Sequence, residues 1–174
     1  DEGKGKVLLK LIENYSAIVR FNGGHNAGHS LKVGDIELVA HILPSGGLIE
    51  GKELWLGGNV LVNHIQLLKE INELRELGFD VTNRIFIDHR AILASPFDCF
   101  IDSAEETFKS QNGLKVGTTG RGIGQGFGYD TTRNGLRYGN ILKSDFKDRC
   151  KQHFDYQKNL LSRFYSIYGY KVAN

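Results

Sequence analysis

The chain has 174 residues, of which 40% are hydrophobic and 24% charged, and its formal net charge is +2. This is the composition of a folded domain that can bury its own core, and it excludes disordered and fibrous proteins. The low net charge argues against a nucleic-acid partner, because phosphate binding needs an excess of positive charge. No apolar run approaches the roughly eighteen residues of a membrane span and no signal sequence is visible, so we expect a cytoplasmic protein with no membrane partner.

The predicted elements alternate between helices and strands. In chain order they are a short helix over Val7–Ile12, a strand over Ala17–Phe21, a hairpin from Leu31 to Leu43 that turns at Gly34-Asp35, extended segments at Glu53–Leu56 and Val60–Val62, a helix after the cap Asn63, a strand over Arg84–Ile87, a helix from Phe97 to Phe108, and a long helix opened by Ser144 and Asp145. This alternation predicts an α/β layered fold with a mainly parallel sheet and one β-hairpin, in a single domain over residues 1–174.

The helix after Asn63 has the clearest periodicity. Asn63 is a suitable N-cap, and Gly78 stands at the C-terminal position that favours glycine. Apolar residues recur every three positions and predict the buried face: Ile65, Leu68, Ile71, Leu74 and Leu77.

Glycine marks the candidate binding loops. The chain contains 22 glycines and 2 prolines in 174 residues. Glycine is therefore about 13% of the residues against an average of about 7%, and proline about 1% against about 5%. The glycines concentrate near residues 3–5, 23–28 and 113–139. Because glycine lets backbone N–H groups approach a ligand closely, these loops are where we expect the chemistry.

The first loop combines carboxylates, glycines and lysines ahead of a predicted helix: Asp1, Glu2, Gly3, Lys4, Gly5 and Lys6. Backbone donors at a helix N-terminus and ammonium groups favour an anion, so this loop is a candidate phosphate cradle. It is not a Walker A loop, because Val7 stands where Ser or Thr would bind magnesium. A solvated chain end is the alternative.

The second loop follows the predicted strand at Ala17–Phe21. The spacing of His25 and His29 imitates half of a zinc-protease helix, but Asn26 replaces the required Glu, so zinc is not expected. An imidazole, an amide and exposed backbone suit proton transfer beside a nucleotide. A polar turn without a ligand is the alternative.

The third loop spans residues 116–124. Thr118, Thr119 and Arg121 alternate there with glycines, a combination that can wrap a phosphate. A plain glycine-rich surface loop is the competing interpretation. The remaining histidines are expected to be structural or surface residues: His41, His64, His89 and His153.

Taken together, five segments resemble the adenylosuccinate synthetase family. They are DEGKGK at residues 1–6, RFNGGHNAGHS at 20–30, HILPSG at 41–46, GTTGRGIG at 117–124 and RNGLRYGN at 133–140. The resemblance covers only the N-terminal part of that family's longer chain. It therefore implies an incomplete piece of a larger P-loop-like purine ligase domain.

The resemblance implies a reaction and roles for individual residues. The family uses GTP to join L-aspartate to inosine monophosphate, giving adenylosuccinate, GDP and phosphate through a 6-phosphoryl intermediate. By resemblance, Asp1 is the general base and His29 the general acid, while Asp1 and the carbonyl of Gly28 hold Mg²⁺.

The resemblance also implies the nucleotide contacts. Those to GTP would come from Asp1, Glu2, Gly3, Lys4, Gly5, Lys6, Gly28, His29 and Ser30. Those to inosine monophosphate would come from Asp1, Lys4, Asn26, Ala27, Gly28, His29, Thr119 and Arg133. Arg133 would act across the interface of a homodimer.

Two segments depart from the family pattern, Gly57-Gly58-Asn59 and residues 125–130. They leave open a divergent paralogue, such as a viral one, that acts on another purine nucleotide. A non-catalytic nucleotide-binding module is a further alternative. We expect the isolated chain to be inactive, because the aspartate and guanine contacts of the family lie outside it.

Overall fold

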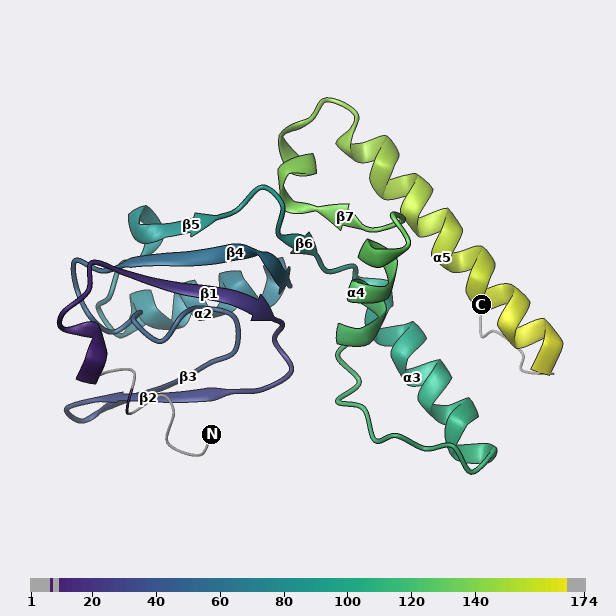
Figure 1. Ribbon diagram of the computed structural model, residues 1–174, viewed down its shortest axis with the longest axis horizontal. Helices are drawn as coiled ribbons and strands as arrows, with labels where there is room; N and C mark the ends of the chain where they lie inside the picture. The colour runs from purple at the N-terminus through teal and green to yellow at the C-terminus, as the bar shows by residue number, and fades with distance from the viewer. Residues whose placement is uncertain (1–6, 8–9, 169–174) are drawn as a thin grey trace.

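The computed structural model describes residue 7 and residues 10–168, and Figure 1 shows their arrangement. A β-sheet lies at the centre of one half, with a hairpin and one helix on the same side of it. Three further helices form the other half. This mixed α/β architecture, with a mainly parallel sheet and a separate antiparallel hairpin, confirms the predicted fold class.

The described elements follow the predicted order closely. The strands are β1 (Ala17–Gly23), β2 (His29–Val33), β3 (Ile36–Ala40), β4 (Glu53–Val62), β5 (Ile85–Ile87), β6 (Ile92–Leu93) and β7 (Leu136–Arg137). The helices are α2 (His64–Glu76), α3 (Pro96–Gln111), α4 (Ile123–Thr131) and α5 (Phe146–Tyr168), with 3₁₀ turns η1 (Thr82–Arg84) and η2 (Tyr138–Leu142). Residues 7 and 10–12 are also helical. None of the helices in these ranges has the length and apolar character needed to cross a bilayer.

Strand β4 organises the sheet. It pairs in parallel with β1 along one side, and with β5 and then β6 along the other, while β7 adds antiparallel to β6. The prediction of two separate extended segments here was wrong, because β4 runs straight through Gly57 and Gly58. A Cβ on Gly57 would lie 3.2 Å from the carbonyl oxygen of Arg20, so the glycine lets β1 approach closely.

Helix α2 has the predicted ends but only part of the predicted buried face, since Leu74 is fully buried and Ile71 packs against the core. The side chain of Asn63 accepts hydrogen bonds from the N–H groups of Ile65 and Gln66, at 3.1 Å each. However, Ile65 and Leu68 are 62% and 57% exposed. The core instead receives a stripe at i, i+3 and i+7: Leu67, Glu70 and Leu74. A three-residue repeat drifts around a helix of 3.6 residues per turn, which is why the prediction was correct for Leu74 and wrong for Ile65 and Leu68.

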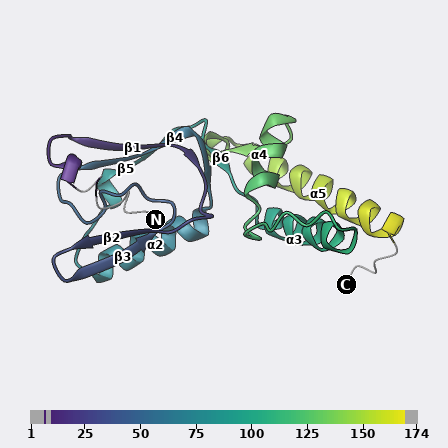
Figure 2. The same ribbon diagram turned by 60° about the horizontal axis from the view of Figure 1, so that its bottom comes forward.

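Two hydrophobic clusters hold the fold together. Figure 2 shows the elements that they join, with the hairpin β2–β3 and α2 on one side of β1, β4 and β5, and α4 next to β6. The larger lies between the sheet, the hairpin β2–β3 and α2, and includes Leu31, Leu38, Ile42, Leu54, Leu56, Val60, Leu67 and Leu74. The smaller joins β4 and β6 to α4 through Leu61, Ile92, Ala94, Ile123 and Phe127. The two clusters share β4, so this strand connects both halves.

Helix α4 arises within the glycine-rich stretch, where no helix was predicted. Glycine disfavours helix, but here it allows close packing. A Cβ on Gly126 would lie 2.6 Å from Cδ1 of Leu61 on β4. Tertiary contact therefore outweighs the low intrinsic propensity of this segment.

Candidate functional site

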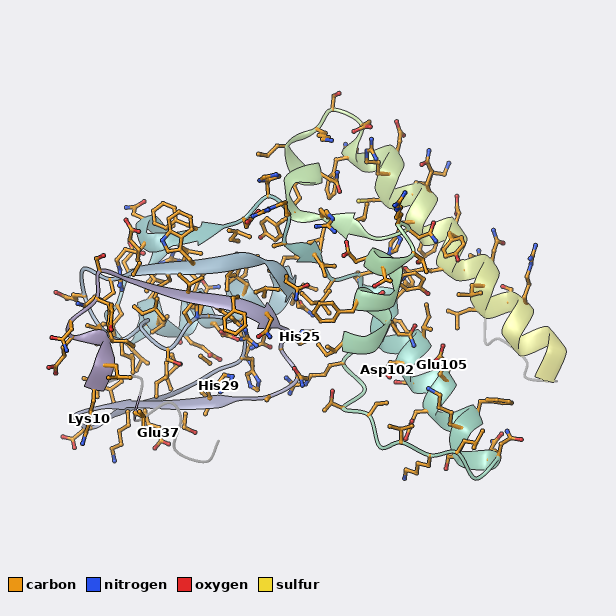
Figure 3. The ribbon with its side chains drawn as sticks, in the orientation of Figure 1. Lys10, His25, His29, Glu37, Asp102 and Glu105 are labelled. Carbon is orange, nitrogen blue, oxygen red and sulfur yellow. The ribbon has the colours of Figure 1, made fainter. Side chains whose placement is uncertain are left out.

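The loop between β1 and β2 and the start of β2 carry the second candidate motif, and Figure 3 labels His25 on the loop and His29 at the start of β2. His29 opens β2 and pairs with Ala40 of β3. Gly28 lies directly against the hairpin, since a Cβ there would be 2.7 Å from Val39 Cγ1 and 3.1 Å from His41 Cε1. The glycine is thus required by close approach, and it places the Gly28 backbone beside His29.

A cavity of about 510 Å³ lies beside this loop. Ala27 and His29 form part of its wall, and the rest is Ile18, Val19, Arg20, Phe21, Asn22, Gly23, Leu43, Pro44 and Ser45. Its volume is within the range of small-molecule sites, which is about 300–1,000 Å³. His29 is therefore placed where it can face a bound ligand.

The third motif joins the second through Arg121. Its guanidinium donates a hydrogen bond to the carbonyl oxygen of His25 and lies 3.2 Å from Nδ1 of His41. On the other side, the N–H of Gly122 donates to the Asp102 carboxylate of α3 at 3.0 Å. Two loops that are distant in sequence are thus held side by side.

Thr119 belongs to the wall of another cavity, of about 540 Å³. Its partners there come mostly from α3 and the segment that follows it: Ser103, Glu106, Thr107, Ser110, Gln111, Lys115, Thr118 and Gly120. Hydroxyl and amide groups dominate this set, and they suit a polar or anionic ligand.

His25 is a buried histidine at the centre of these contacts. It is 5% exposed, and its Nε2 lies 3.3 Å from the side-chain nitrogen of Asn63. Burial, reinforced by the nearby charge of Arg121, lowers the pKa of His25 to about 4. The imidazole is therefore neutral at neutral pH and suits a positioning role better than proton transfer.

Arg133 has an unusual backbone. Its φ is 62°, and it is the one non-glycine residue with positive φ among those described. It follows α4 at a helix-ending position, where its N–H donates to the carbonyl of Asp130 at 3.0 Å. Left-handed φ costs a non-glycine residue about 1–2 kcal/mol. Such strain gathers at functional positions, and the side chain of Arg133 is exposed.

The structure describes only some of the predicted site residues. Asp1, Glu2, Gly3, Lys4, Gly5 and Lys6 lie outside the described residues. Asn26, Ala27 and Gly28 lie between β1 and β2, and His29 and Ser30 are the first two residues of β2. Thr119 is on the loop that Arg121 ties to His25, and Arg133 follows α4.

The predicted magnesium site is likewise only partly visible. Among the residues that the structure describes, no group of three or more His, Cys, Asp or Glu could hold a metal ion. Of the two expected ligands, only Gly28 is described, and a carbonyl oxygen is a donor that suits Mg²⁺. Magnesium binding stays a prediction.

Sequence reasoning missed three residues that shape the site: Arg20, His41 and Glu70. Arg20 donates to the carbonyl of Gly24, and His41 contacts both Gly28 and Arg121. Glu70 binds the backbone around His41. The sequence carried one usable signal, since Glu70 shares an i, i+4 stripe with the apolar Leu74.

Comparison with known proteins places these loops in a family. The family model described as adenylosuccinate synthetase matches residues 1–174. The chain belongs to the adenylosuccinate synthetase family. The five motifs quoted above thus indicated the correct family.

Individual relatives agree. The chain is 41% identical over 166 residues to adenylosuccinate synthetase of Pseudomonas fluorescens strain SBW25, covering 95% of this chain and 38% of the relative. With that of Shewanella denitrificans it shares 38% identity over 168 residues, again covering 38% of the relative. The chain therefore spans about 38% of the length of these curated relatives.

Solved structures support the same conclusion. The fully ligated adenylosuccinate synthetase of Plasmodium falciparum superposes with a TM-score of 0.86 at 34% identity, covering 92% of this chain and 37% of that one. The succinoaminodeoxyadenylate synthetase of cyanophage S-2L matches with a TM-score of 0.58 at 23% identity, over 80% of this chain and 38% of that one. At that identity the second match shows the fold alone.

Proposed function

We propose that this chain supplies the proton-transfer and phosphate-binding loops of a ligase that joins L-aspartate to inosine monophosphate at the expense of GTP. The proposal rests on the hydrogen bond that the guanidinium of Arg121 donates to the carbonyl oxygen of His25. This hydrogen bond joins the loop of Thr119 to the loop of Asn26–His29. It supports the proposal because the family resemblance implies purine contacts from both loops.

The residue types suit the chemistry. O6 of hypoxanthine is a poor leaving group, so it must be phosphorylated before an amine can displace it. In our proposal Asp1 takes the proton from N1, and O6 attacks the γ-phosphorus of GTP as the bond to GDP breaks. His29 donates a hydrogen bond to the transferring phosphoryl group. The aspartate amine then attacks C6, the bond from C6 to the phosphorylated O6 breaks, and phosphate leaves. The amine nitrogen loses one proton to the departing phosphate, which gives adenylosuccinate.

Magnesium would neutralise part of the phosphate charge during this reaction. Its ligands from the chain would be the Asp1 carboxylate and the Gly28 carbonyl. The close contact of Gly28 with Val39 and His41 supports this assignment, because it holds the backbone at that position in place.

Arg133 would complete the site of a partner subunit in a homodimer. Its exposed side chain and strained backbone support a role outside its own loop. A guanidinium is suited to bidentate contact with phosphate, here that of inosine monophosphate.

The proposal is tested first by binding. Calorimetric titration of the 174-residue chain with inosine monophosphate, and separately with GTP and Mg²⁺, should show weak binding. His29→Asn should reduce it, whereas His89→Asn should not, because the side chain of His89 is 79% exposed and beside Asp88. Equal titration curves for all three proteins would contradict the placement of the site.

Activity provides the second test. The chain alone should form no adenylosuccinate, and addition of the remaining portion of a family-length protein should restore turnover. Asp1→Asn and His29→Asn should then each lower turnover about a hundredfold, the scale of acid–base groups. Nucleotide binding without any turnover in the restored protein would favour the non-catalytic module instead.

A further inference from the structure

The carboxylate of Glu70 on α2 is buried against the core and accepts hydrogen bonds from backbone N–H groups. The side chain is 0% exposed. Its oxygens accept hydrogen bonds from the N–H groups of His41 at 2.9 Å, Ile42 at 3.0 Å and Leu43 at 2.9 Å. Gln66 adds a fourth donor at 2.8 Å. All four partners donate, a pattern that a carboxylate can satisfy and a carboxamide cannot.

Arg20 of β1 binds the same segment, residues 41–43, by donating to the carbonyl groups of that segment. Its guanidinium donates to the carbonyl oxygens of His41 and Ile42, the latter at 3.1 Å. The same guanidinium donates to the carbonyl of Gly24, at the start of the candidate loop. The segment 41–43 is thus fixed by an anion on its N–H groups and by a cation on its carbonyl groups.

The imidazole of His41 connects this fixed segment to the candidate site. It lies under Gly28, where a Cβ would be 3.1 Å from Cε1 of His41. Its Nδ1 is 3.2 Å from the guanidinium of Arg121, which also donates to the carbonyl of His25. One side chain therefore touches both candidate loops, and its backbone N–H is bound by Glu70.

We propose that Glu70 is a positioning residue for the nucleotide site. By binding the backbone at His41–Leu43, it sets the place of the His41 ring and so the spacing between the loops of Gly28 and Arg121. The link to catalysis rests on the proposed function, whereas the positional effect does not. Glu70 touches no reacting group, so it acts through His41.

The first test follows the geometry by NMR, with Glu70→Gln compared with Glu76→Gln as an exposed control on the same helix. Glu70→Gln turns an amide donor toward backbone donors. We expect its amide shift changes to pass beyond residues 41–43 and reach residues 24–29 and Arg121. The control should perturb only its neighbours on α2. Changes in Glu70→Gln that stop at Leu43 would overturn the proposal.

The second test measures binding of inosine monophosphate. At a temperature where both variants are folded, Glu70→Gln should weaken binding about tenfold or more, because small displacements of site groups are costly, and Glu76→Gln should leave it unchanged. Unchanged affinity in folded Glu70→Gln overturns the proposal. A parent chain that binds no nucleotide counts against the proposed function instead, and the NMR result still decides the positional effect.

A milder variant serves if Glu70→Gln does not fold. Gln66→Ala removes one donor to Glu70 and leaves the carboxylate in place. It should produce smaller shift changes along the same route, from His41 to Gly28 and Arg121. Changes confined to α2 would overturn the proposal.

Discussion

The side-chain amide of Gln157 on α5 donates a 2.8 Å hydrogen bond to the buried carboxylate of Asp98 on α3. Asp98 also accepts from the N–H of Ser95 at 2.9 Å, and the Ser95 hydroxyl is 3.0 Å from the other end of the Gln157 amide. These three polar groups join α3 to α5. Since α3 also binds the N–H of Gly122 through Asp102, the packing of α5 supports the loop of Arg121.

The first prediction concerns Asp98. Burial raises its pKa to about 6, although its two hydrogen bonds act in the opposite direction. The folded chain therefore holds this proton more tightly than the unfolded chain, whose value is 3.8. The resulting stabilisation is full below pH 3.8 and is lost as the pH rises through about 6. By that shift it amounts to about 3 kcal/mol.

Urea denaturation from pH 4 to pH 8 measures this effect. Asp98→Asn should remove the contribution and be the more stable protein at pH 8, since the Gln157 amide can reverse to accept from the new side chain. Asp148→Asn, an exposed residue of α5, should follow the parent. Parallel curves for the parent and Asp98→Asn would show that Asp98 does not titrate in this window.

The second prediction concerns His25, whose pKa shift makes stability change with pH in the opposite direction to that of Asp98. Its pKa falls from 6.5 to about 4 in the folded chain, chiefly through burial. Below pH 6.5 the unfolded chain takes up a proton that the folded chain excludes, so stability falls as the pH is lowered toward 4. His25→Gln should flatten this slope, and His64→Gln, at an exposed position, should not. NMR titration of the His25 ring checks the cause directly, and an ordinary titration near pH 6.5 would contradict it.

The third prediction compares two glycines of α4. A Cβ on Gly126 would lie 2.6 Å from Leu61 Cδ1, whereas one on Gly128 would meet nothing within 4 Å. Gly128→Ala should therefore raise the free energy of unfolding by about 0.5–1 kcal/mol, the usual gain in a helix. Gly126→Ala should lower it by about 1–3 kcal/mol through overpacking. Thermal and urea unfolding of both variants test the pair, and equal effects would show that α4 does not pack on β4 in this way.

The fourth prediction separates strain from function at Arg133. Arg133→Gly relieves a φ of 62° and should raise the free energy of unfolding by about 1 kcal/mol. Arg133→Ala keeps the strain and should leave the free energy of unfolding unchanged.

Both variants should lose turnover in the restored enzyme, since both lack the guanidinium. Mixing Arg133→Ala with Asp1→Asn chains should recover activity in hybrid dimers if Arg133 serves the partner site. Hybrids that form without turnover would place the arginine in its own subunit.

The sequence identified the candidate loops because their chemistry is local. Glycines at close spacing with His25, Asn26, His29 and Thr119 predict binding loops from residue types that lie next to one another in the chain. The family resemblance then assigned these loops to one family, that of adenylosuccinate synthetase. The helix caps were equally readable, since Asn63 and Gly78 act on the backbone within a few residues.

The tertiary structure decided what lies behind the loops. Glu70 reads as a surface residue of α2 until the backbone of residues 41–43 packs on it. α4 forms despite its glycines because Leu61 requires close packing at Gly126. Local propensity and periodicity act over a few residues, whereas a buried carboxylate or a close glycine contact depends on segments that only the fold brings together. The sequence by itself therefore determined the family and indicated the candidate loops, and only the fold decided how Glu70, Arg20 and His41 contact those loops.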